Sequence, residues 1–174
     1  MIQHPPLDAG DLPLEINRTL VRCEGFLDLK LTARAAAELE SVPTAFHNHF
    51  YFRWLRVQIM TSRQEWTSAL PEITRLREAF PAEPGFWIQE AYITRRAVGI
   101  EAARDILEQA SPRFPDEAVI HFNLGCYACQ LGKLEEAKQR IKSAIDLDAK
   151  WLAQALDDED YEPLRDTLEE WSCA

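Results

Sequence analysis

The chain has 174 residues, of which 47% are hydrophobic, and its formal net charge is -10. This length suits one continuous core or a short stack of repeats rather than two independent domains. No run of 18 apolar residues is present, so we expect no membrane span, and the clustered negative charge disfavours nucleic acid and anionic membrane surfaces, which carry the same sign.

The N-terminal segment, residues 1–13, is a Pro-rich polar lead that we expect to be extended or flexible. It lacks the basic start and apolar core of a signal peptide, so the simplest expectation is a cytoplasmic protein. Four cysteines, at positions 23, 126, 129 and 173, do not have the pattern of a disulfide framework.

Apolar residues at helical spacing then predict an all-α chain built from four helix pairs. Thr32 and Ser62 are the predicted N-caps of the second helices in the first two pairs. Pro71 lies inside the second helix of the second pair, where we expect a bend or a local break near residues 67–69. The predicted units span residues 14–49, 50–83, 84–117 and 118–150.

The four units share columns of small and apolar residues at a fixed step of 34 residues. The clearest column holds Ala35, Ala69, Ala103 and Ala137. A second column holds larger apolar residues, and two further columns mark the place where the helices of a pair cross. These columns are Leu39, Ile73, Leu107, Ile141; Val42, Leu76, Ala110, Ala144; and Cys23, Val57, Ala91, Gly125.

A 34-residue unit of two helices with small residues at their crossing resembles the tetratricopeptide repeat (TPR). The resemblance is strongest in residues 84–150, where Trp87, Gly125 and Gly132 add to the columns. It implies a right-handed superhelical solenoid of about four repeats, whose first helices line a concave groove. Residues 151–174 are predicted to be acidic C-terminal capping helices, with Asp160 as the cap of the last helix; from residue 146 to 170 there are ten acidic and two basic residues.

By analogy with the family, certain positions on the first helix of each unit face the groove and bind a partner. Aromatic residues and arginine dominate binding energy at protein interfaces, and amides can hydrogen-bond an extended peptide. Packing between helices is the alternative role for the aromatic members. The predicted partner-binding residues are Tyr51, Trp54, Gln58, Gln89, Tyr92, Arg95, Arg96, Phe122, Asn123 and Gln130.

Motifs for catalysis or cofactor binding are lacking, and we predict a non-enzymatic protein with no cofactor and no metal. There is no phosphate-binding loop, dinucleotide fingerprint, zinc-protease motif or nucleophile elbow. Cys126 and Cys129 are at most half of a zinc site, with no second close pair in sequence to complete it, and we expect both to pack as small residues within the stack. His47 and His49 lie at a junction between units, where capping is the expected role.

The resemblance implies an adaptor or scaffold that binds another protein or peptide through the concave groove. In size and repeat type the chain is similar to the bacterial kinesin-light-chain-like proteins, which would make the partner a cytoskeletal filament. A chaperone-tail receptor is disfavoured, because Ile88 and Tyr92 replace the lysine and asparagine of the carboxylate clamp. The alternatives are self-assembly into a homo-oligomer through the weak first repeat, and a metalloprotein or enzyme using Cys126, Cys129 and a histidine.

Overall fold

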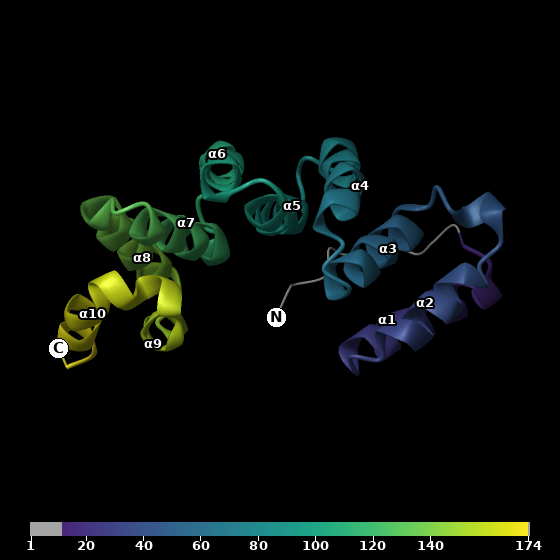
Figure 1. Ribbon diagram of the computed structural model, residues 1–174, viewed down its shortest axis with the longest axis horizontal. Helices are drawn as coiled ribbons and strands as arrows, with labels where there is room; N and C mark the ends of the chain where they lie inside the picture. The colour runs from purple at the N-terminus through teal and green to yellow at the C-terminus, as the bar shows by residue number, and fades with distance from the viewer. Residues whose placement is uncertain (1–11, 174) are drawn as a thin grey trace. The chain divides into compact units, whose positions relative to one another are not determined.

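The computed structural model describes residues 12–173, which contain ten α-helices and two short 3₁₀ helices and no strand (Figure 1). The predicted all-α repeat class is confirmed. Most of the predicted flexible lead lies outside the described residues. Leu12, which is described, packs against the hydrophobic core formed by buried side chains of residues 20–93. None of the described helices combines the length and the apolar character needed to cross a membrane.

The chain divides into two compact units, residues 1–97 and 98–174. The described helices of the first unit are α1 (Leu14–Asp28), α2 (Thr32–Glu40), η1 (Thr44–Phe46), α3 (Phe50–Ser62), α4 (Trp66–Ala79) and α5 (Pro84–Ala97). Those of the second are α6 (Ile100–Ala110), α7 (Ala118–Gln130), α8 (Leu134–Leu147), α9 (Lys150–Asp157), η2 (Glu159–Leu164) and α10 (Arg165–Ser172).

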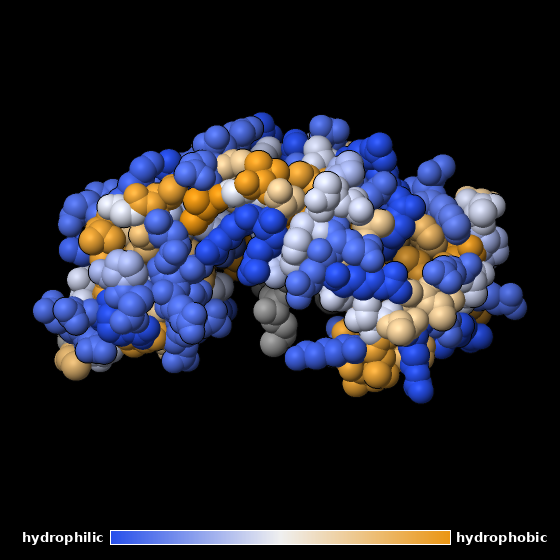
Figure 2. All heavy atoms as spheres, viewed as in Figure 1, coloured by the Kyte–Doolittle hydropathy of each residue, from blue (hydrophilic) through white to orange (hydrophobic). Residues whose placement is uncertain are grey.

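The 34-residue columns form the interior of both units. All four alanines of the first column are fully buried, and no member of the larger apolar column is more than 5% exposed. Small side chains at the crossing points let paired helices approach closely, and the larger ones fill the space between them. Hydrophilic residues cover much of the face in Figure 2, with hydrophobic patches between them.

A left-handed backbone residue also recurs every 34 residues, in the turn between paired helices. Lys30, Gln64 and Gly132 have φ values of 58°, 60° and 72°. The corresponding residue of the third predicted pair is Val98, and a β-branched side chain disfavours this conformation. There the positive φ of 152° falls on Gly99 instead, and α5 continues to Ala97. The boundary between the two compact units lies at this irregular turn.

The predicted caps were wrong in detail. Thr32 is the first residue of α2 and Ser62 the last residue of α3, and neither caps a helix. The helix after Ser62 starts only at Trp66, because the turn has to include the left-handed Gln64. Asp160 does not cap the last helix, because α10 is preceded by Leu164, which makes no side-chain cap hydrogen bond. Asp158 instead caps η2, where its carboxylate accepts a hydrogen bond from the Asp160 amide at 2.9 Å.

Pro71 does not break α4, which runs unbroken from Trp66 to Ala79. Proline removes one backbone hydrogen bond, but Ala69, Ile73 and Leu76 of the same helix are buried in the first unit. Packing of this apolar face holds the helix together across the missing bond.

Ion pairs and hydrogen bonds join successive helices of the first unit. Arg56 pairs with Glu72 at 2.6 Å, and Arg22 pairs with Glu38, each 34 residues earlier, at 3.0 Å. Between α4 and α5, Arg77 Nε donates to the buried carboxylate of Glu90 at 2.6 Å. Because Glu90 also accepts from the Thr74 hydroxyl, its buried charge is well compensated.

Candidate protein-binding surface

An aromatic and arginine cluster lies on α4 and α5 of the first unit. The Trp66 and Tyr92 rings meet edge to face, with centroids 5.8 Å apart. The Arg96 guanidinium lies 5.3 Å from the Tyr92 centroid and 5.9 Å from that of Trp66. Tyr92 is 38% exposed and Arg96 is also exposed, so both are open to a partner. We call Trp66, Tyr92 and Arg96 the α5 cluster.

The Arg96 guanidinium has hydrogen-bonding capacity left for a partner. A guanidinium carries five N–H donors, and its cation–π contacts with the two rings are not hydrogen bonds to an acceptor oxygen. Within residues 12–173, no carboxylate forms an ion pair with Arg96. The cluster therefore combines an apolar platform with a preorganised cation, the combination found in strong protein-binding sites.

The predicted binding residues on α3 are more deeply placed. Trp54 is 1% exposed and packs edge to face on Phe86, and the buried Tyr51 hydroxyl donates to Glu24 at 2.6 Å. Trp54 Nε1 and Gln58 Nε2, four residues apart on α3, are buried donors with no acceptor in the described structure. An unpaired buried donor costs free energy, which an acceptor brought by a ligand or water would recover.

In the second unit, the matching face of α7 is covered by the chain itself. The Tyr161 hydroxyl donates to the Phe122 carbonyl at 2.7 Å, and the Gln130 side-chain amide donates to the Asp160 carbonyl at 3.1 Å. Phe122 also packs against the ring of Trp151 on α9. Two of the predicted binding residues of this unit, Phe122 and Gln130, are thus engaged by residues 151–161.

The structure places the predicted binding residues at three depths. Fully buried are Tyr51, Trp54, Gln89 and Phe122; half-buried are Gln58, Arg95 and Asn123; exposed are Tyr92, Arg96 and Gln130. The partner-binding role of all ten stays a prediction. Trp66 is not among the predicted binding residues, because it starts the second helix of its repeat, whereas the family pattern places groove positions on first helices.

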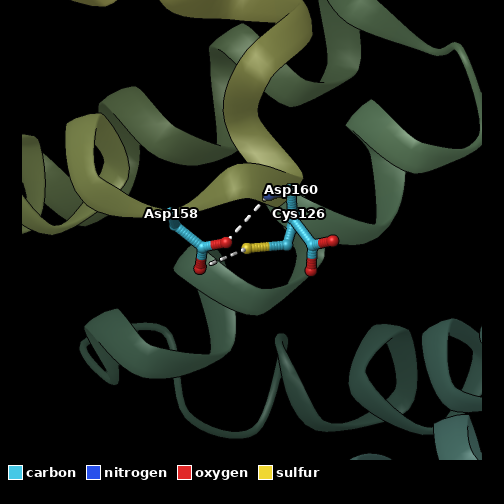
Figure 3. Close-up of side chains that lie close together, drawn as sticks. All are labelled: Cys126, Asp158 and Asp160. Carbon is cyan, nitrogen blue, oxygen red and sulfur yellow. Dashed lines mark hydrogen bonds between the residues drawn. The ribbon is translucent and has the colours of Figure 1, made fainter.

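Cys126, Asp158 and Asp160 lie together where η2 meets α7 (Figure 3). One ligand atom from each lies within 4.8 Å of the others, and Cys126 Sγ is 3.8 Å from an Asp158 carboxylate oxygen. The sequence offered no second pair of metal ligands near Cys126, but the fold brings the carboxylates of Asp158 and Asp160 to its thiol. No histidine belongs to this group among the described residues, and the ring of His121 bonds instead to the Pro115 carbonyl at 2.9 Å.

Burial next to this group keeps the protons of the Cys129 thiol and the Tyr161 hydroxyl bound, because it raises both pKa values. Burial, followed by the nearby carboxylates of Asp160 and Asp158, raises the pKa of the Cys129 thiol to about 11. Burial is also the main cause that raises the pKa of the Tyr161 hydroxyl far above its usual range. A thiol that stays protonated at neutral pH is a weak nucleophile and metal ligand, so Cys129 contributes mainly to packing.

Structural comparison supports a TPR-like helical-repeat fold. The chain is similar to the solved structure "MamA RS-1 ArsTM double mutant", with a TM-score of 0.67 and 16% identity over 82% of this chain and 80% of that one. It is also similar to "MamA MSR-1 C2", with a TM-score of 0.64 and 19% identity over 83% and 82% of the two chains. At these identities the likeness concerns the fold. No protein-family model and no curated protein matches the sequence.

Proposed function

We propose that this protein is a non-enzymatic scaffold that binds a linear segment of another protein across α3 and α5 of its first unit. The observation that carries the proposal is the exposed α5 cluster, in which Tyr92 and Arg96 occupy predicted groove positions. Tyrosine, tryptophan and arginine are the residue types most enriched at the energetic centres of interfaces.

A further feature supports this choice of surface. On α7 the equivalent face is already covered by the chain's own residues. The first unit therefore offers the open part of the predicted groove.

The nature of the partner follows from resemblance and charge. A filament subunit is the partner that the kinesin-light-chain-like resemblance implies, and we retain it, with a cytoplasmic location, as part of the proposal. The net charge of -10 disfavours nucleic acid as the ligand.

Affinity capture with quantitative mass spectrometry tests the proposal. The bait is the full chain, compared with a Tyr92→Ala/Arg96→Ala variant and with an Arg34→Gln control. Arg34 is also an exposed arginine, above the Phe26 ring, but it lies on α2. We expect a partner that the control retains and the double variant loses, with unchanged helical circular dichroism. Equal capture by all three proteins would place the binding surface elsewhere.

Self-assembly is the second candidate, because charge is unevenly divided between the units. Residues 12–97 contain eleven basic and ten acidic side chains, whereas residues 98–174 contain eight basic and seventeen acidic ones. The nearly neutral first unit is repelled less by the acidic second unit of another copy than two acidic second units repel each other, so contacts between copies are favoured through the first unit. Light scattering over a range of concentrations tests it: a mass that stays at 20.0 kDa would exclude self-assembly, and a mass that rises with concentration would support it.

A further inference from the structure

The second unit contains a built-in example of how a first helix of the repeat holds an acidic segment. Gln130 of α7 donates its side-chain amide to the main-chain carbonyl of Asp160. One turn earlier, the Cys126 thiol faces the Asp158 carboxylate. These two positions of α7 thus contact an acidic stretch through one main-chain and one carboxylate interaction. Figure 3 shows the second of them, between Cys126 and Asp158.

The repeat period identifies the matching positions in the first unit. Residues 34 before Cys126 and Gln130 are Tyr92 and Arg96, the two exposed members of the α5 cluster. Arginine is a stronger partner than glutamine for a carboxylate, because its bond is charge-assisted and can be bidentate.

The other first helices suit an acidic ligand less well. On α3 the two matching positions hold Gln58 and Ser62, which carry no charge. On α1 they hold Glu24 and Asp28, which would repel a carboxylate. Charge complementarity therefore selects α5 as the place for an acidic segment.

We propose that the α5 cluster binds an acidic linear segment of a partner protein, with a carboxylate of that segment on the edge of Arg96. The inference rests on the proposed scaffold function and specifies the chemistry of its ligand. The chain's own acidic stretch is an unsuitable occupant from a second copy, because Tyr161 within it is 0% exposed and is held on α7.

One feature of the α7 contact does not transfer to α5. Tyr161 packs directly on Gly125, where a Cβ would lie 2.2 Å from its hydroxyl oxygen. The matching residue of α5 is Ala91, whose Cβ occupies that space. An aromatic or aliphatic residue of the partner is therefore expected to lie on the exposed Tyr92 ring rather than to insert against the helix.

A synthetic octapeptide with the sequence of residues 157–164, Asp-Asp-Glu-Asp-Tyr-Glu-Pro-Leu, is a suitable probe. It would be acetylated, amidated and fluorescently labelled, and its binding to the full chain measured by fluorescence polarisation. The control peptide replaces every Asp by Asn and every Glu by Gln. The protein variants are Arg96→Gln, which keeps the hydrogen-bonding amide found at the matching position of α7, and the matched exposed-arginine control Arg34→Gln.

We expect saturable binding of the acidic peptide that weakens about tenfold or more in Arg96→Gln, the size expected for losing a charge-assisted hydrogen bond. Arg34→Gln should bind as the unchanged chain does, and the neutral peptide should bind at least tenfold more weakly. Equal binding by Arg96→Gln, equal loss in both variants, or no saturable binding would each overturn the inference.

The outcome is separable from that of the scaffold proposal. If the captured partner depends on Tyr92 and Arg96 but the acidic peptide does not bind, the ligand chemistry is wrong and the scaffold function stands. If light scattering shows self-association that Arg96→Gln abolishes, the occupant is a second copy, and the assignment to a partner protein is wrong.

Discussion

The contact between Gly125 and Tyr161 shows how one residue decides the packing of the second unit. The Tyr161 ring is completely buried, and its hydroxyl is fixed by a hydrogen bond to the Phe122 carbonyl. Its terminal oxygen occupies the space in which any other residue at position 125 would carry a Cβ. The glycine in the middle of α7 is therefore required by a close approach rather than by backbone conformation.

Replacing Gly125 by alanine should destabilise the protein. The new Cβ would lie 2.2 Å from the Tyr161 hydroxyl oxygen, so the ring has to move and its buried hydrogen bond is strained. We expect the free energy of unfolding to fall by about 1–3 kcal/mol, the usual cost of overpacking. Urea denaturation followed by circular dichroism measures it.

Gly25→Ala is the matched control for this substitution. Gly25 also lies inside a helix, but nothing comes within 4 Å of a Cβ built there. Alanine has the higher helix propensity, so this variant should gain about 0.5–1 kcal/mol. A similar gain for Gly125→Ala would show that Tyr161 does not pack on α7.

At the scale of the element, the turn between paired helices is set by its left-handed residue. Lys30 and Gln64 adopt a conformation that glycine adopts at lower cost, whereas Gly132 already has the favoured residue type. Val98 cannot follow the pattern, and the turn after α5 is rearranged around Gly99. A single β-branched residue thus marks the irregular connection between the two compact units.

Exchanging residue types at this turn position should change stability in opposite directions. Gln64→Gly relieves the left-handed strain and should raise the free energy of unfolding by about 0.5–1 kcal/mol, whereas Gly132→Gln should lower it by about 1 kcal/mol. Both effects are measurable as shifts of the urea midpoint at constant slope. A loss of stability in Gln64→Gly would mean that the side chain contributes more than the backbone strain costs.

At the scale of the whole molecule, acidic charge is concentrated in the second unit. Residues 98–174 carry seventeen acidic and eight basic side chains, so their self-repulsion opposes folding. Ions screen exposed charges, and screening strengthens as salt rises. The first unit, nearly neutral over residues 12–97, lacks this repulsion.

Salt should therefore stabilise the two units unequally. Hydrogen exchange with peptide-level mass spectrometry, at 50 and 500 mM NaCl, resolves them in the intact chain. We expect exchange to slow more in peptides from residues 98–173 than in those from residues 12–97. Equal slowing would indicate a general salt effect on hydrophobic burial rather than relief of repulsion.

The sequence by itself determined the repeat architecture. Columns at a 34-residue step, such as the four alanines from Ala35 to Ala137, follow from the need to pack identical helix pairs, and all of these residues are buried. The turn at Gly132 could also be predicted from the sequence, because a helix that ends in a left-handed residue favours glycine there. Local rules of this kind depend only on neighbours along the chain or one repeat away.

Only the tertiary structure decided which predicted groove positions are open. Trp54 and Phe122 occupy groove positions in the sequence pattern, yet one is packed on Phe86 and the other is covered by Trp151 and Tyr161. The tertiary structure also decided that Trp66, on α4, contacts Tyr92 and Arg96 on α5. Exposure depends on what the rest of the chain places over a side chain, and repeat spacing carries no information about that.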